Sequence, residues 1–223
     1  MRKFLIAGLA ICLWSVAASG ASTEPVGKVE KIGPASDASI PDTVKKVLEP
    51  NGYRIVLADG SVACEIWFRQ GVAAQKKADI EGVLYPQLAE SALVGVIVFP
   101  SATTDYRGLP IKAGAYTLRY ALLPNDGNHL GVAPNRDFLL LIPAASDSSP
   151  DAVLKFTELM NLSRQATGSR HPGSLSMAEG KEGPVAAVSE DQEGHWVFST
   201  RLKLASGEEM PFGLIIKSSG PAA

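Results

Sequence analysis

Short segments with a period of two residues recur along this chain, and they restrict its fold more than any other feature of the sequence. The clearest such segment lies in residues 115–123, where one set of side chains alternates with another: Tyr116, Leu118, Tyr120 and Leu122 against Thr117, Arg119 and Ala121. This alternation predicts a half-buried β-strand. A second strand is predicted over residues 138–142, and the loop between the two is rich in turn-forming residues.

The same reasoning predicts strands in other parts of the chain. Residues 53–57 and 62–68 read as a hairpin joined at Asp59 and Gly60 by a type I′ turn. Alternation in its second strand directs Cys64 inward and Trp67 outward. The continuous apolar run over residues 92–99 is typical of a central strand. Three closing strands are predicted over residues 184–188, 195–204 and 210–217.

Helical signals are few. A short helix is predicted to begin at Ser39, and one long helix is predicted over residues 146–168, with Ser149 as its cap, Pro150 in its first turn and Gly168 at its exit. Residues 70–91 are expected to be irregular. The predicted fold class is therefore mainly β: an antiparallel β-sandwich, jelly-roll or immunoglobulin-like, with one long inserted helix and a short N-terminal helix.

The N-terminus has the features of a secretory signal peptide. Arg2 and Lys3 precede an apolar run over residues 4–18, and small residues follow it at positions 19–21. The run is shorter than the roughly 20 residues that a membrane-spanning helix needs. We expect a signal peptide over residues 1–21, a flexible tether over 22–38, a single β-sandwich domain over 39–218 and a disordered tail over 219–223. The predicted location is periplasmic or extracellular, with no transmembrane segment after cleavage.

The charge of the chain limits the classes of partner it can bind, and its cysteine content bears on disulfide formation. The chain has 21 basic and 23 acidic residues. Loss of Arg2 and Lys3 with the leader leaves 19 basic and 23 acidic residues, a net charge of −4. Nucleic-acid binding needs clustered cations, so we predict no nucleic-acid partner. Cleavage also removes Cys12, which leaves Cys64 without a disulfide partner, and its apolar surroundings predict a buried thiol.

The loop over residues 125–137 carries most of the polar chemistry. It contains Asp126, Asn128, His129, Arg136 and Asp137, which are candidate metal ligands or acid and base groups. The same residue types also build tight turns, so a purely structural loop is the alternative. His171, which follows the predicted long helix, is expected to approach the same rim, and these six residues form the predicted binding site.

The sequence lacks the motifs of several common enzyme classes. It contains no G-x-S-x-G, H-E-x-x-H, C-x-x-C, G-x-G-x-x-G or phosphate-loop pattern. We therefore predict no cofactor, no bound metal and no catalytic residue. Aromatic residues make up 7% of the chain, and Trp67 is the one outward-facing aromatic side chain that we expect on a glycan-binding surface.

Two phrases resemble known proteins. Residues 109–119, LPIKAGAYTLR, resemble the turn-then-strand phrase of exported bacterial β-sandwich modules. The longer phrase up to Pro143 is similar to uncharacterised bacterial proteins that carry a signal peptide. The resemblance implies a fold type and no activity.

Three functional hypotheses follow. The first is an exported, non-catalytic binding module at the bacterial cell envelope, with a protein, glycan or small-molecule partner. The second is a small metal-dependent or acid/base hydrolase with a site around the 125–137 loop. The third is a carrier for an apolar ligand, which requires an internal cavity.

Overall fold

The computed structural model describes residues 27–76, 79–124, 135–181, 183 and 186–217. Two α-helices, one 3₁₀ turn and twelve strands lie in these ranges. In chain order they are β1 (Gly27–Ile32), α1 (Asp42–Lys45), β2 (Gly52–Leu57), β3 (Val62–Phe68), β4 (Leu93–Phe99), β5 (Thr103–Thr104), β6 (Pro110–Ile111), β7 (Gly114–Leu122), β8 (Asp137–Pro143), the 3₁₀ turn η1 (Ala144–Ser146), α2 (Phe156–Thr167), β9 (Ser174–Ala178), β10 (Ala187–Glu190), β11 (Trp196–Lys203) and β12 (Glu209–Lys217).

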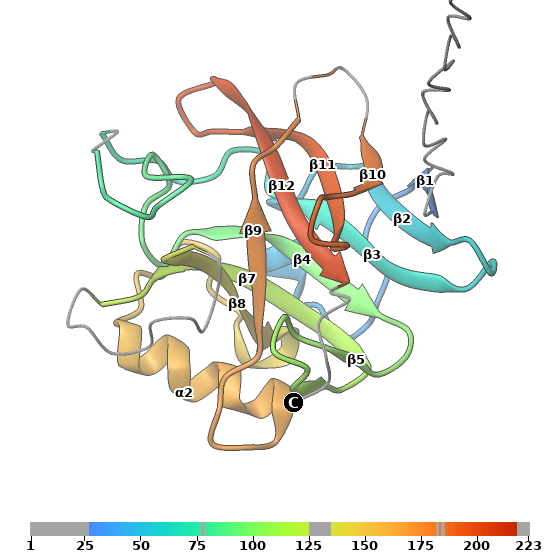
Figure 1. Ribbon diagram of the computed structural model, residues 1–223. Coiled ribbons are helices and arrows are strands. Elements are labelled where there is room, and N and C mark those ends of the chain that lie inside the picture. The colour runs from blue at the N-terminus through green and yellow to red at the C-terminus, as the bar shows by residue number, and fades with distance from the viewer. Residues whose placement is uncertain (1–26, 77–78, 125–134, 182, 184–185, 218–223) are drawn as a thin grey trace, which may run out of the picture.

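Ten of the strands form one antiparallel sheet in the order β1-β2-β3-β4-β7-β8-β9-β12-β11-β10. The two edge strands, β1 and β10, lie beside each other, so the sheet curls into a nearly closed, barrel-like shape (Figure 1). The prediction of a mainly β, antiparallel fold is confirmed. The prediction of a sandwich of jelly-roll or immunoglobulin type is not confirmed, because the strands belong to a single continuous sheet.

The middle of the barrel is a hydrophobic core built from inward-facing side chains of most strands. Ile66 of β3, Leu118 and Tyr120 of β7, Phe198 of β11 and Phe212 of β12 all have less than 2% of their surface exposed. β4 lies between β3 and β7, and both of its faces are buried, as its continuous apolar sequence predicts. Side chains therefore fill the interior, and the apolar-carrier hypothesis gains no support from it.

The outer face of β7 is buried, whereas the alternation predicted a half-buried strand. Thr117 and Arg119 are completely covered, because the chain after β8 passes over them. Arg119 donates to both carboxylate oxygens of Asp147, from Nε at 2.8 Å and from Nη2 at 2.7 Å. Its other donors reach the carbonyl oxygens of Ser91, Ser149 and Ala152 at 2.7–3.0 Å. All five guanidinium N–H groups thus have acceptors.

Helix α2 begins ten residues later than the sequence predicts. Residues 147–154 are not helical, and the carbonyl groups of Ser149 and Ala152 accept hydrogen bonds from Arg119 instead of continuing a helix. At the actual start, the Glu158 carboxylate accepts the Lys155 N–H at 2.9 Å. The predicted exit is correct, because Gly168 ends the helix with a φ of +69°. The predicted short N-terminal helix is the single turn α1.

The predicted tether over residues 22–38 is wrong in its described part. Residues 27–32 form β1, which pairs with β2 over six residues. The sequence gives no sign of this strand, because its side chains stay partly exposed on both faces and therefore show no apolar alternation. The chain that follows covers Trp67, whose Nε1 donates to the Gly33 carbonyl at 2.8 Å. Trp67 is 3% exposed, so its predicted outward exposure is also wrong.

The predicted hairpin of β2 and β3 is present, with a different turn. Gly60 has a φ of +83° and donates to the Leu57 carbonyl, and the Leu57 N–H donates to Ser61. Among the described residues, Ser91 is the one non-glycine residue with positive φ. Asp59 therefore lacks the conformation that a type I′ turn requires, and the loop is a three-residue turn closed by Gly60.

Three further findings concern Cys64, β9 and the length of the helices. Cys64 is buried, and this burial raises the pKa of its thiol to about 12. β9, which pairs with both β8 and β12, lies between the predicted long helix and the predicted closing strands, where the sequence predicts no strand. Within the described residues, no helix is long and apolar enough to cross a membrane.

Replacement of Arg119 by Met is expected to lower the free energy of unfolding by about 3–5 kcal/mol, because it leaves the Asp147 carboxylate buried without its counter-charge. Arg54→Met is the matched control. Arg54 pairs with Glu65 at a partly exposed site, so its loss is expected to cost about 1 kcal/mol or less. Urea unfolding of the two variants measures both values, and equal losses would contradict a special role for Arg119.

Candidate functional site

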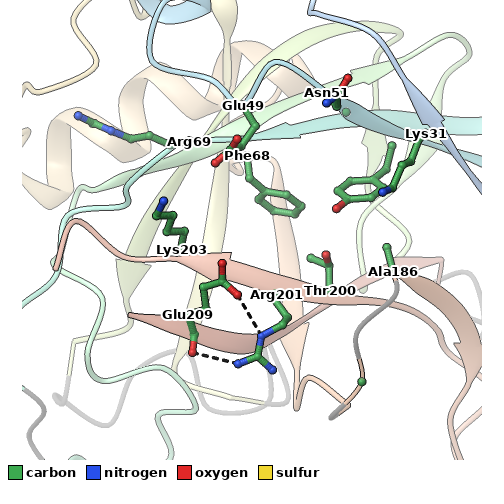
Figure 2. Close-up of a pocket in the computed structure, with 13 residues that line it drawn as sticks. Lys31, Glu49, Asn51, Phe68, Arg69, Ala186, Thr200, Arg201, Lys203 and Glu209 are labelled. Carbon is green, nitrogen blue, oxygen red and sulfur yellow. Dashed lines mark hydrogen bonds and ion pairs between the residues drawn. The ribbon is translucent and has the colours of Figure 1, made fainter. Parts of the chain in front are cut away.

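One candidate site is a cleft between two parts of the barrel wall. One side is formed by β1, β2, β3 and the segment that precedes β2, and the other by β11 and β12 (Figure 2). Its volume is about 450 Å³. The side chains of Thr200, Arg201 and Lys203 line the side formed by β11. Glu49, Asn51 and Phe68 line the opposite side.

Aromatic side chains form the inner wall of the cleft. Tyr53 and Phe68 line it directly, and both rings pack on Phe198 beneath, with centroid distances of 5.5 and 6.3 Å. Phe68 also contacts Phe212 edge-on at 5.8 Å. Tyr53 is half-buried, whereas Phe68 is 5% exposed. The period-two alternation of β2, β3 and β11 brings these rings to one place, and Tyr53 is the ring that a ligand can reach.

The charged side chains of the cleft fall into two groups. Arg201 is paired with Glu209, with 3.4 Å between Nε and Oε2, and Arg69 is paired with Asp151 and donates to the Pro150 carbonyl. The second group is Lys31, Lys203 and Glu49, whose side chains have no ion pair or hydrogen bond within the part of the chain that the structure describes. Four basic and two acidic side chains line the cleft, although the whole chain has a net charge of −2.

The structure describes three of the six predicted site residues. Asp126, Asn128 and His129 lie outside the described residues. Arg136 and Asp137 both hold the segment that precedes β4. Arg136 donates from its backbone N–H to the Gly82 carbonyl at 2.7 Å and from Nη1 to the Glu81 carbonyl at 3.2 Å.

The Asp137 carboxylate is completely buried and accepts the backbone N–H groups of Leu84 and Tyr85 at 3.0 and 2.8 Å. The Tyr120 hydroxyl lies 3.3 Å from its Oδ2 and donates at 2.9 Å to the Tyr85 carbonyl. Burial, with the charge of Asp137, raises the pKa of Tyr120. Burial also raises the pKa of Tyr85 to about 12. Asp137 therefore anchors the segment that precedes β4, and both of its carboxylate oxygens are engaged in hydrogen bonds.

His171 lies elsewhere. It is exposed after the end of α2, and its Nε2 accepts a hydrogen bond from Arg170 Nε at 3.3 Å. Asp137 points into the barrel core, whereas His171 belongs to a pocket on the outer side of β8 that the next residue, Phe138, also lines. The structure thus does not bring His171 and the Asp137 carboxylate together.

One acid and base pair was missed by the sequence reasoning. His195 is 5% exposed, and its Nδ1 lies 3.0 Å from Oδ2 of Asp191. The signal was the D-x-x-x-H spacing across the turn that joins β10 and β11. Asp191 also accepts the backbone N–H groups of Glu193 and His195, so it builds that turn as well. A depression of about 380 Å³ is lined by this pair and by Asn135, which belongs to the predicted site loop.

The described residues contain no group of three or more His, Cys, Asp and Glu side chains placed to hold a metal ion. Comparisons of this chain with protein-family models, with curated proteins and with solved structures found no match.

Asp191 is expected to make stability depend on pH. Burial acts to raise its pKa, but the hydrogen bonds from His195 and Glu193 outweigh burial and lower it. A lowered native pKa stabilises the fold above the unfolded value of about 3.9, and this contribution is lost as pH falls through the native pKa. Asp191→Asn is therefore expected to unfold more easily than the wild type at pH 5–7 and equally easily near pH 2.

Urea unfolding at a series of pH values measures this difference. Asp79→Asn, a substitution at an exposed acid, is the control and is expected to show no such pH-dependent difference. A difference between wild type and Asp191→Asn that persists unchanged at low pH would contradict the assignment.

Proposed function

We propose that this protein is an exported, non-catalytic binding module of the bacterial cell envelope, and that its cleft binds a small anionic ligand rich in hydroxyl groups, such as an acidic sugar. The observation that carries the proposal is the pair of lysines, Lys31 and Lys203, which line one cleft without an acidic partner among the described residues. The predicted leader supports export, and the cleft favours the glycan or small-molecule class among the predicted partners.

Electrostatics support an anionic ligand. Lysines that line a concave surface with apolar walls create a positive potential that raises the local concentration of anions. The neighbouring arginines, Arg69 and Arg201, are engaged with Asp151 and Glu209 and add less to this potential. The two unpaired lysines outnumber Glu49, the one unpaired acid of the cleft, so the cleft carries a positive excess although the whole chain is slightly acidic.

The remaining lining supports a ligand with hydroxyl groups and an apolar face. Asn51 and Thr200 offer hydrogen-bond donors and acceptors, and the half-buried ring of Tyr53 offers an apolar surface with a polar tip. The cleft volume of about 450 Å³ lies in the range of roughly 300–1,000 Å³ that is typical of small-molecule sites.

An acid/base hydrolase is the second candidate function. The observation that favours it is the contact between His195 and Asp191 in a depression that Asn135, from the predicted site loop, also lines. A histidine oriented by a carboxylate is the arrangement that general-base catalysis uses. This reading predicts that a bound sugar acid is cleaved, whereas the binding module leaves it intact.

The double substitution Lys31→Gln and Lys203→Gln is expected to weaken binding of digalacturonate about tenfold, equivalent to about 1.4 kcal/mol. The substitutions remove both ammonium groups and keep side chains of similar length. Lys46→Gln, an exposed lysine that does not line the cleft, is the matched control and is expected to bind as the wild type does. Isothermal titration calorimetry measures the affinities, and the wild-type affinity is expected to fall as salt is added.

Maltose, a neutral disaccharide, is the control ligand. Equal affinity for maltose and digalacturonate, no binding of digalacturonate, or no effect of the double substitution would each contradict the proposal. Chromatography of the ligand after the titration shows whether it was cleaved. Cleavage that is lost in His195→Ala would favour the hydrolase instead.

A further inference from the structure

A second concave site lies on the outer side of the barrel, between α2, the start of β8 and the chain that follows the helix. Its volume is about 160 Å³. The walls are apolar and come from Leu123, Phe138, Phe156 and Met160. Phe138 is 5% exposed, and Phe156 and Met160 are half-buried on the face of α2 that packs on β8. The pocket is thus an apolar hollow that the helix leaves beside the sheet.

Three arginines and a histidine form the rim of this hollow: Arg107, Arg164, Arg170 and His171. Asp105 neutralises the first of them, with 2.8 Å between Arg107 Nη2 and Oδ2. Arg164 and Arg170 have no carboxylate partner within the described residues, and both are exposed. The rim therefore carries two positive charges without counter-charges beside an apolar surface.

The guanidinium of Arg164 is held in place by neutral groups. Its Nη1 donates to Asn161 Oδ1 at 2.6 Å, and its Nε donates to the Arg170 carbonyl at 2.8 Å. These bonds orient the guanidinium without neutralising it. Its Nη2 has no acceptor among the described residues. A planar, oriented guanidinium with free donors is well suited to a carboxylate, which accepts two parallel N–H groups.

We propose that this pocket binds a small aromatic carboxylate, with its ring between Phe138, Phe156 and Met160 and its carboxylate on Arg164 and Arg170. The size of the ring follows from the volume, because an apolar cavity of about 150 Å³ accommodates benzene. Offset or edge-on ring contacts and a methionine sulfur both favour an aromatic ring over a saturated one. The site is separate from the cleft and does not depend on the function proposed for it.

The test uses 3-phenylpropionate as the probe and isothermal titration calorimetry as the measurement. We expect a dissociation constant on the order of 0.1–1 mM for this small ligand. Arg164→Gln and Arg170→Gln are each expected to weaken binding at least tenfold. Arg164→Lys is expected to recover part of the loss in Arg164→Gln, since it restores the charge without the planar geometry. Thermal unfolding checks that each variant is folded.

Two controls and two further probes make the outcome decisive. Arg54→Gln, an arginine on the sheet far from α2 in sequence, and Lys203→Gln in the cleft are both expected to leave binding unchanged. The neutral analogue 3-phenylpropanol is expected to bind at least tenfold more weakly, and inorganic phosphate alone is also expected to bind more weakly. Equal binding of the alcohol, equal binding of phosphate, an unaffected Arg164→Gln variant or no binding of 3-phenylpropionate at 10 mM would each overturn the proposal.

Discussion

Arg119 fixes the outer face of the sheet, because every N–H of its guanidinium has an acceptor, either on Ser91 or on the segment 147–152. Asp147 supplies the counter-charge, and carbonyl groups from residues 91, 149 and 152 supply the remaining acceptors. A buried charge is tolerated only when it is compensated in this way. The segment between β8 and α2 must therefore lie across β7 in a non-helical conformation, and this in turn determines where α2 can begin and which side of β8 it covers.

Basic side chains that form an ion pair within the chain have a structural role, whereas those without a carboxylate partner in a concave site are candidates for ligand binding. Arg119, Arg54 and Arg107 each contact a carboxylate of the same chain. Four basic side chains without such a partner among the described residues lie at two concave places: Lys31 and Lys203 in the cleft, and Arg164 and Arg170 at the pocket beside α2. These four side chains are the basis on which we propose two different anionic ligands, a hydroxyl-rich one for the wide polar cleft and an aromatic one for the narrow apolar pocket.

Much of the fold was predictable from the sequence, because β2, β3, β4, β7, β8, β11 and β12 carry alternating or continuous apolar patterns. The start of α2 was not predictable. Ser149 and Pro150 form a local helix-start signal, but the carbonyl groups of this segment accept hydrogen bonds from Arg119, which is distant in sequence. β1 gave no signal because both of its faces stay partly exposed, so its sequence has no alternation of apolar and polar residues. The candidate cleft was missed because Lys31 and Lys203 lie far apart in sequence and form no motif. Asp137 was predicted as a site residue on residue type alone, and its buried hydrogen bonds explain why an aspartate stands at the start of β8.

The order of strands in the sheet bears on how the molecule folds. From β1 to β9 the order in space follows the order in the chain, apart from the separate two-stranded β5–β6 unit. Each strand can therefore join the growing sheet soon after it is synthesised, with a short search for its partner, and such neighbouring contacts favour fast folding. The exception is β12, which reaches past two strands to pair with β9. The barrel and the cleft that β11 and β12 line are thus complete only when the last strand of the chain has paired with β9.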